Sequence, residues 1–270
     1  MKHKYSSSST IQTLLMKTPI PSYIRNPIDL FGSYKFKNFS LSLPLPYPYP
    51  LRKNRSDLPF TPYGTSPTKM MQFLLYSGKL SNVCIYSAET LHVEYVNDVP
   101  RVFFKNPKNN LNEFIRKCEK PFIVIRLGID VGNDGHANTL IVNKTTLPWS
   151  IERFDPNGSP SEYDEDRFGN LVRVTDSMLK QMFWNFDYIG PVDTCPNIGI
   201  QTFAEKVNEG NDLLTGFCQT WSVWYSILRL LNAEVPPADI VNDLLMMEPR
   251  LLYNVMQDFY YFVKTTATEP

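Results

Sequence analysis

Apolar and polar residues alternate along several short runs in the middle of the chain. HVEYV (92–96) and RVFF (101–104) alternate and are separated by the turn-forming pair Asn97-Asp98, which predicts a β-hairpin. Further short apolar or alternating runs follow at PFIVIRLGID (121–130), NTLIVN (138–143), WSIERFD (149–155) and YIGPVD (188–193). Loop-forming residues separate the first three, so we expect three consecutive strands of one sheet, with YIGPVD as a further strand.

Helical periodicity dominates the last third of the chain. One helix is predicted to open at Gly216, within LLTGFCQTWSVWYSILRLLN. Other helices are predicted around Met70–Leu74, Asn110–Cys118 and Asp176–Phe186, after Pro236-Pro237, and over Pro249–Thr265. Strands in the centre and helices late in the chain predict an α+β fold, with a central mixed or antiparallel sheet packed against a buried helix.

The first 66 residues differ in composition from the rest. They include LPLPYPYPL, whose closely spaced prolines favour an extended polyproline conformation over helix or sheet. They hold nine Lys/Arg and two Asp/Glu, whereas residues 67–270 hold 18 Lys/Arg and 25 Asp/Glu. The net charge is therefore +7 for the first 66 residues and −7 for the rest. We expect a basic Pro/Ser-rich arm at 1–66, largely extended or disordered, and one folded domain at 67–270. Such an arm is a candidate for contact with nucleic acid or another acidic partner.

Composition narrows the class of protein. Apolar residues make up 43% and charged residues 20%, which is typical of a soluble globular protein. Cys84, Cys118, Cys195 and Cys218 form no CxxC pair, which argues against zinc clusters and a disulfide-stapled secreted domain and favours a reducing compartment. No run approaches the roughly 18 apolar residues of a membrane helix. We expect a soluble cytoplasmic protein without a metal or cofactor.

The helix that opens at Gly216 carries a candidate nucleophile. It is apolar nearly all round, with Arg229 as its only charged residue, so it belongs in the core. Cys218 stands in its first turn, where backbone N–H groups and the positive end of the helix dipole stabilise a thiolate. The simpler interpretation is that Cys218 is a small buried apolar residue, the commoner fate of a free cysteine. A histidine able to act as the base for Cys218 would favour the nucleophile interpretation over the buried apolar one.

The chain offers three histidines as the base: His3, His92 and His136. His136 immediately precedes an apolar strand in GHANTLIVN (135–143), so its imidazole can project from a sheet edge into a cleft. His92 lies inside an alternating strand, and His3 lies in the arm, where nothing fixes its geometry. Asp155 closes the next strand, nineteen positions after His136, and can hold the proton of one ring nitrogen. Glu152 is the local alternative, on the opposite strand face.

Acyl transfer also needs hydrogen-bond donors for the oxyanion. The amide of Cys218 at a helix N-terminus supplies one. Gln201, in NIGIQTF upstream of the cysteine, is the candidate for a second donor. A glutamine at an unplaced position is more often a polar surface residue, so both interpretations of Gln201 stay open.

The order of these residues resembles the clan of papain-like cysteine proteases that contains adenain, the ubiquitin-like (SUMO) proteases and the YopJ-type effectors. GHANTLIVN, SIERFDPNG, IGIQ and GFCQTWSVWYSILRLLN look like uncharacterised members encoded by large double-stranded DNA viruses. The resemblance covers roughly residues 120–233. It implies Cys218 as nucleophile, His136 as general base, Asp155 as its acid partner and Gln201 as oxyanion donor.

Three positions depart from the pattern of the clan. Ala137 stands where the clan has a tryptophan after the histidine, and Gln219 stands where a glycine often follows the cysteine. Gln201 lies seventeen residues before Cys218, farther than usual. The intervening segment is polar and contains Gly210-Asn211, so it can be an inserted loop that leaves Gln201 near the site.

The resemblance implies a thiol protease that hydrolyses peptide or isopeptide bonds of a protein substrate. Viral polyproteins and ubiquitin-like conjugates are the two substrate classes, in the host cytoplasm or the virion. YopJ-type relatives use the same triad to transfer an acetyl group, so an acetyltransferase is one alternative. A non-catalytic binding or structural module is another, with Ala137 and the displaced Gln201 as its signs. The intact His136, Asp155 and Cys218 favour an enzyme.

Overall fold

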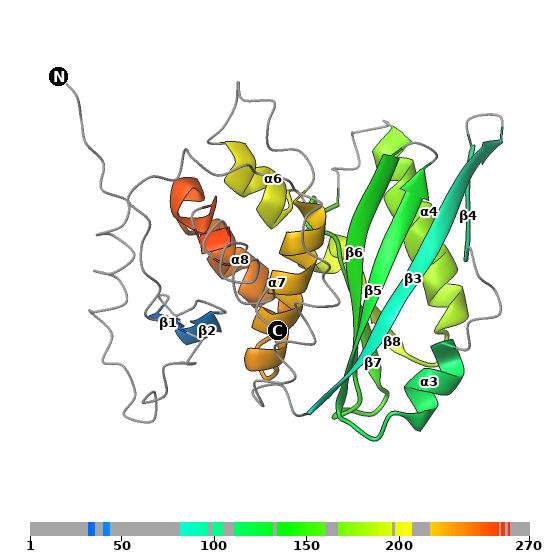
Figure 1. The fold of residues 1–270 in the computed structure, drawn as a ribbon, viewed down its shortest axis with the longest axis horizontal. Helices are drawn as coiled ribbons and strands as arrows, with labels where there is room; N and C mark the ends of the chain where they lie inside the picture. Colours follow the sequence, from blue (N-terminus) through cyan, green and yellow to red (C-terminus); the bar gives the residue numbers. More distant parts are fainter. Residues whose placement is uncertain are drawn as a thin grey trace, which may run out of the picture.

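A six-stranded mixed sheet forms the centre of the molecule (Figure 1). The computed structural model describes residues 32–35, 40–43, 82–96, 99–104, 111–131, 134–159, 167–195, 198–206, 217–253, 255–256 and 259. The strands lie in the order β4-β3-β5-β6-β7-β8. They are β3 (Val83–Val96), β4 (Val99–Phe104), β5 (Phe122–Val131), β6 (Asp134–Asn143), β7 (Ser150–Phe154) and β8 (Asp187–Ile189). The pairs β3–β5 and β7–β8 are parallel and the others are antiparallel, so the fold is α+β with a mixed sheet.

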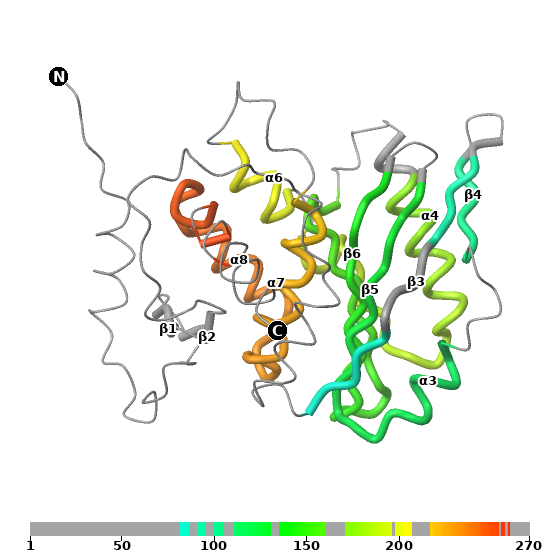
Figure 2. Tube along the Cα trace, viewed as in Figure 1, coloured from blue at the N-terminus to red at the C-terminus, as the bar shows by residue number. Residues whose placement is uncertain are grey.

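Helices cover both faces of this sheet (Figure 2). One face carries α3 (Leu111–Lys117) and α4 (Arg167–Met182), and the other carries α6 (Ile200–Glu205), α7 (Cys218–Leu231) and α8 (Pro237–Leu245). Strand β5 is apolar on both faces, because Ile123 and Ile125 pack in the core on the α4 side while Val124 packs in the core on the α7 side. Burial on both faces explains why FIVI (122–125) is a continuous apolar run.

The strand pattern in the sequence predicts most of the sheet. The β3–β4 hairpin is confirmed, with Val96 opposite Val99 across the Asn97-Asp98 pair. Strands β5, β6 and β7 are confirmed as consecutive antiparallel neighbours. The prediction of a strand over all of YIGPVD is wrong beyond Ile189. A short helix, α5 (Pro191–Thr194), begins there, because proline fits the first turn of a helix and the Asp193 carboxylate accepts the Gly190 N–H at 2.8 Å.

Helix boundaries are predicted less accurately. Helix α4 begins at Arg167, nine residues before the predicted start, and ends at Met182. Phe186 donates its N–H to the Phe183 carbonyl in a turn that ends the helical run. Helices α3, α7 and α8 agree with their predictions to within a few residues, whereas α6 was not predicted. Residues 249–253 are helical as expected; residues 260–265 and the predicted helix at 70–74 lie outside the described residues.

The structure corrects the expectation for the cysteines. Cys84 on β3 and Cys118, just after α3, form a disulfide, while Cys195 and Cys218 are free. The parallel β3–β5 pair requires a crossover connection, which here includes α3 and returns the chain beside the start of β3. Sequence spacing does not reveal this approach. The disulfide contradicts the expectation that the cysteines form no structural disulfide, so the cysteine pattern no longer supports a reducing compartment.

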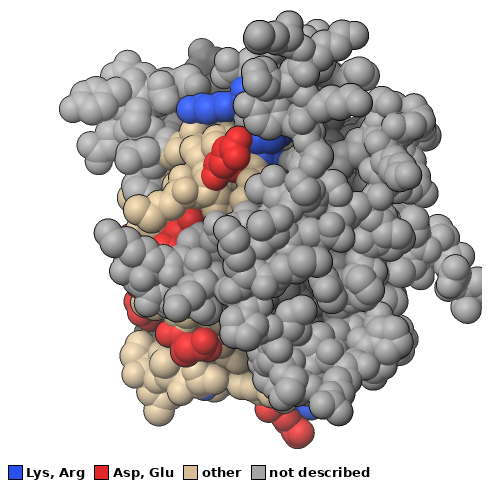
Figure 3. Space-filling model, turned by 90° about the vertical axis from the view of Figure 1, so that its left-hand side faces the viewer, with Lys and Arg blue, Asp and Glu red and all other residues tan. Residues whose placement is uncertain are grey.

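Part of the predicted N-terminal arm is described. Strands β1 (Gly32–Lys35) and β2 (Ser40–Leu43) form an antiparallel pair, and β2 lies against α7. The rest of residues 1–66 lies outside the described residues, so the boundary at residue 66 stays a prediction. Acidic side chains lie at several places on the described part of one side of the molecule (Figure 3), in keeping with the net charge of −7 after residue 66. Within the described ranges, no helix is long and apolar enough to cross a membrane.

Candidate active site

Two serines of helix α7 fix its position along strand β6. The Ser222 hydroxyl donates to the Ala137 carbonyl at 3.0 Å, and the Ser226 hydroxyl lies 3.0 Å from the Thr139 hydroxyl. Four residues of helix and two of strand both span about 6 Å, so the two contacts repeat in register. One turn earlier on the helix stands Cys218, whose Sγ accepts the Ala137 N–H at 3.4 Å. The alternation of β6 places Ala137 on the α7 side, where a small side chain leaves room for the helix.

His136, Asp155 and Cys218 lie together at this end of the sheet. The Nε2 atom of His136 lies 2.7 Å from Oδ1 of Asp155, and the imidazole also hydrogen bonds with Cys218. Because Nε2 is taken by the carboxylate, Nδ1 is the ring nitrogen left for the thiol. The His136 side chain is 21% exposed, whereas that of Asp155 is only 4% exposed. Solvent therefore reaches the His136 side chain, whereas the Asp155 side chain is shielded from solvent.

Electrostatics favour a protonated histidine. Burial alone lowers the pKa of His136, but the charge and hydrogen bond of Asp155, together with those of Cys218, outweigh it and raise the pKa to about 10. Burial likewise raises the pKa of Asp155, and the His136 charge overrides this and lowers it. Asp155 Oδ1 also accepts the Asn157 N–H at 2.9 Å. An imidazolium between a carboxylate and a sulfur is the arrangement that stabilises a thiolate.

A fully buried arginine supports Asp155 from behind. Arg153 Nη1 lies 3.5 Å from Asp155 Oδ2 and donates to Asn138 Oδ1. Its Nε donates to Asp176 Oδ1 on α4 at 2.7 Å, and the same oxygen accepts the Tyr188 hydroxyl. One guanidinium thus bridges the candidate catalytic carboxylate and a carboxylate of α4. A buried charge is tolerated only when it is paired in this way.

The other candidates for the base and the acid are engaged elsewhere. Glu152 lies on the opposite face of β7, where its carboxylate accepts the Tyr225 hydroxyl and the Arg229 Nε at 2.9 Å. Its role is to hold α7 against the sheet. His92 Nδ1 lies 3.5 Å from Asp130 on β5. His3 lies outside the described residues.

Gln201 is buried on α6, next to the loop that follows Asp155. Its backbone N–H donates to the Pro156 carbonyl at 3.0 Å, and its side-chain Nε2 lies 3.3 Å from Glu205 Oε2. Its Oε1 is buried without a hydrogen-bond partner among the described residues. Glu205 also hydrogen bonds with Trp221, one turn after Cys218, and burial raises the pKa of Glu205 to about 7. Gln201 therefore lies between the Asp155 loop and the first turns of α7, and one of its amide hydrogens is directed at Glu205.

Two glycines bring α6 close to the Asp155 loop. Gly158 has a φ of 79°, in the left-handed region that favours glycine. A Cβ on Gly199 would lie 2.2 Å from the Pro156 carbonyl oxygen, and one on Gly158 would lie 2.4 Å from the Gly199 nitrogen. The Gly199 N–H donates to the Asn157 carbonyl at 3.0 Å. Only glycine at both positions permits this backbone contact.

Sequence reasoning missed the residues that support the triad. Arg153, Asn138, Glu205 and Gly199 were not singled out. A signal for Arg153 exists, because SIERF places two adjacent charges in a strand whose neighbours are apolar, and buried charges require partners. The Asn-Gly pair after Asp155 likewise signals a tight turn. Neither Glu205 nor Gly199 carries a local signal, because their contacts come from distant segments.

Comparisons with known proteins give little independent evidence. No family model matches the chain. A protein of Acanthamoeba polyphaga mimivirus, named an ankyrin repeat protein, is 26% identical over 149 residues, which cover 51% of this chain. The match covers 19% of that protein's length. A crystal structure of a de-sumoylating protease aligns over 88% of this chain and 95% of its own, with 12% identity and a TM-score of 0.27. This score is too low to support an argument about fold or function.

Proposed function

We propose that the chain is a cysteine peptidase that hydrolyses peptide or isopeptide bonds of a protein substrate with Cys218, His136 and Asp155. The observation that carries the proposal is the contact of His136 with both Asp155 and Cys218 at the first turn of a buried helix. A cysteine that only filled core space would not require a charged partner. The resemblance in residue order supports the same assignment.

The proposed reaction begins with the imidazolium–thiolate pair. The Cys218 thiolate attacks the substrate carbonyl carbon, and the carbonyl π electrons move onto oxygen. Backbone N–H groups of the first turn of α7, which have no partners within the helix, face the resulting oxyanion, and Gln201 is the proposed side-chain donor. His136 then gives its proton to the leaving amine as the C–N bond breaks, which leaves a thioester on Cys218.

Water completes the proposed cycle. His136, now neutral, takes a proton from a water molecule that attacks the thioester carbonyl, and the C–S bond breaks to release the acid and the thiolate. Asp155 remains ionised and keeps Nε2 protonated, so that Nδ1 faces the sulfur throughout. The resemblance suggests viral polyproteins or ubiquitin-like conjugates as substrates, in the host cytoplasm or virion.

The chain offers a matched pair of cysteines for the test. Cys218 and Cys195 are both free, but Cys195 is fully buried, and burial raises its thiol pKa to about 12. We expect ubiquitin-like and peptide electrophilic probes to label the wild type and Cys195→Ala equally. Cys218→Ala and His136→Ala should lose labelling, with intact mass spectrometry locating one adduct.

Three outcomes would count against the proposal. Labelling that survives in Cys218→Ala would remove the nucleophile assignment. A stable acetyl adduct on Cys218 after incubation with acetyl-coenzyme A, together with no cleavage of any peptide library, would favour acetyl transfer over hydrolysis. Failure of both reactions would leave the non-catalytic alternative as the better interpretation.

A further inference from the structure

Hydrogen bonds of one carboxylate connect α6 to the helix that carries Cys218. Gln201 and Glu205 are one turn apart on α6, and Nε2 of Gln201 lies 3.3 Å from Oε2 of Glu205. Glu205 also hydrogen bonds with the side chain of Trp221 on α7, three residues after Cys218. The Glu205 carboxylate therefore lies between the amide of Gln201 and the first turns of α7.

This pair differs from an ordinary polar pair on the surface of a helix. Gln201 is only 5% exposed, and its Oε1 atom is buried without a hydrogen-bond partner among the described residues. The same is true of Oε1 of Glu205. Most buried polar atoms of folded proteins are paired, so two unpaired oxygens on neighbouring side chains require an explanation. Local violations of this rule are expected at functional sites.

An ionised carboxylate selects one of the two orientations of the Gln201 amide. The amide nitrogen carries two N–H donors, whereas the amide oxygen only accepts. A carboxylate also only accepts, so it attracts Nε2 and repels Oε1. Glu205 takes one hydrogen of Nε2, and the second stays available for another acceptor. In the reverse orientation the amide would present its oxygen, which repels an oxyanion.

We propose that Glu205 is the positioning residue for Gln201, whose amide it holds with the second hydrogen of Nε2 directed at the oxyanion formed on Cys218. The inference rests on the proposed function, in which Gln201 is an oxyanion donor. The competing interpretation is that Glu205 only joins α6 to α7 through Trp221. A positioning residue acts through Gln201 and loses its effect when Gln201 is removed, whereas a purely structural residue keeps its effect.

The positioning role requires an ionised Glu205. Burial raises the pKa of Glu205 to about 7, while the hydrogen bonds with Gln201 and Trp221 lower it, and no charged group of the described residues contributes. At pH 8 the carboxylate is mostly ionised, whereas at pH 6 it is mostly protonated and its O–H can donate to the amide oxygen instead. The titratable groups on the described elements packed against α6 are Asp155 on the loop after β7, Cys218, Tyr225 and Arg229 on α7, and Asp239 and Asp243 on α8.

Two reactions of Cys218 separate oxyanion stabilisation from the reactivity of the thiolate. With p-nitrophenyl acetate, the sulfur attacks the acetyl carbon, an oxyanion forms, and the C–O bond then breaks to release p-nitrophenolate and leave a thioester. Iodoacetamide alkylates the same sulfur by displacing iodide and forms no oxyanion. Both rates are measured on the full chain, with the rate of Cys218→Ala subtracted and the adduct located by mass spectrometry. The ratio of acetylation to alkylation cancels the ionisation of Cys218 and reports the oxyanion donors.

The expected ratios at pH 8 follow from the two interpretations. Glu205→Gln keeps the shape of the side chain but removes its charge, and it should lower the ratio roughly tenfold, compared with about 100-fold for Gln201→Ala. Added to Gln201→Ala, Glu205→Gln should change the ratio by less than about twofold, because its effect passes through Gln201. The wild-type ratio should fall as the pH drops from 8 to 6, and this fall should be absent in Glu205→Gln.

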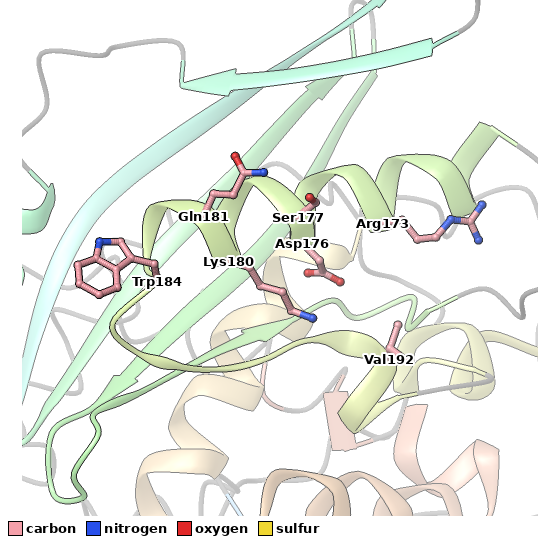
Figure 4. Close-up of a pocket in the computed structure, with 7 residues that line it drawn as sticks. All are labelled: Arg173, Asp176, Ser177, Lys180, Gln181, Trp184 and Val192. Atoms are coloured by element: carbon pink, nitrogen blue, oxygen red, sulfur yellow. The ribbon is translucent and has the colours of Figure 1, made fainter.

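Two control variants make the same chemical changes elsewhere. Gln181→Ala removes an amide from the exposed wall of a shallow groove along α4, on the opposite side of the sheet from α7 (Figure 4). Glu248→Gln removes a carboxylate at an exposed position after α8. Both variants should leave the ratio unchanged.

The outcomes distinguish this inference from the proposed function. An unchanged ratio in Glu205→Gln overturns the inference, and so does an equal loss in the Gln201→Ala background, which would show that Glu205 only joins the two helices. If Glu205→Gln does not fold, a wild-type ratio that is constant between pH 6 and 8 overturns it. Absence of Cys218-dependent acetylation in the wild type removes the nucleophile and the inference together. Acetylation that depends on Glu205, without cleavage of any peptide library, supports the inference and removes the peptidase alone.

Discussion

Replacement of Asp155 by asparagine tests the electrostatics of the candidate site. The substitution preserves the shape of the side chain but removes the charge that lies 2.7 Å from His136 Nε2. Burial, which lowers the pKa of His136, is then opposed only by Cys218 and by a hydrogen bond to the neutral amide oxygen of the asparagine. The pKa of His136 should therefore fall from about 10 toward or below its ordinary value of 6.5.

The size of this effect follows from the pKa of His136. The gap between 6.5 and about 10 corresponds to about 5 kcal/mol of preferential stabilisation of the imidazolium. Because the folded-state value is the higher one, this stability is fully present below pH 6.5 and is lost as the pH rises toward 10. In Asp155→Asn, most of this pH dependence should disappear. Loss of even about 1.4 kcal/mol lowers the population of the imidazolium–thiolate pair tenfold.

Two assays measure the consequence. The rate of Cys218 alkylation by iodoacetamide at pH 6, followed by mass spectrometry, should fall at least about tenfold in Asp155→Asn. Urea unfolding between pH 6.5 and 10 should show a stability decline in the wild type that is reduced in the variant. Asp130→Asn is the control, because it disrupts another Asp–His pair, with His92 at 3.5 Å. Identical alkylation rates in Asp155→Asn and the wild type across pH 5–9 would refute the proposed ion pair.

Three further substitutions test the surroundings of the triad. Gly199→Ala places a Cβ 2.2 Å from the Pro156 carbonyl oxygen and should destabilise the protein by about 2–4 kcal/mol in thermal unfolding, whereas Gly135→Ala, with nothing within 4 Å, should cost far less. Arg153→Met leaves two buried carboxylates without their guanidinium and should cost about 3–5 kcal/mol in urea unfolding; a loss below 1 kcal/mol would contradict the paired network. Gln201→Ala should lower kcat on a cleaved substrate by about 100-fold with little change in KM, and unchanged kcat would exclude it as an oxyanion donor.

The predictable part of this molecule is the part with local signals. Alternation and apolar runs predict β5, β6, β7 and the β3–β4 hairpin, because each run carries the burial pattern of its own two faces. The position of Cys218 at the start of an apolar helix is visible for the same reason. Strand β3 was predicted only in part, because it continues back to Val83 through a register irregularity at Tyr86–Glu89.

The remaining features depend on contacts between distant segments. The Cys84–Cys118 disulfide requires knowledge that a parallel crossover returns the chain to β3. Arg153 supports Asp155 in a position that depends on Asp176 of α4, a distant segment of the chain, because the Asp176 carboxylate holds the Arg153 guanidinium. The catalytic role of the triad and the oxyanion role of Gln201 stay predictions until they are measured.

Strand β7 has a consequence for how this chain tolerates change in length. Glu152 and Phe154 point to one side and hold α7, while Arg153 points to the other and steadies Asp155. Substitutions on either side can be compensated separately. A single-residue insertion or deletion in β7 would instead exchange the two sets, placing an arginine beneath the helix and a phenylalanine against the carboxylates. Point changes in these five residues should therefore be far better tolerated than any change in their number.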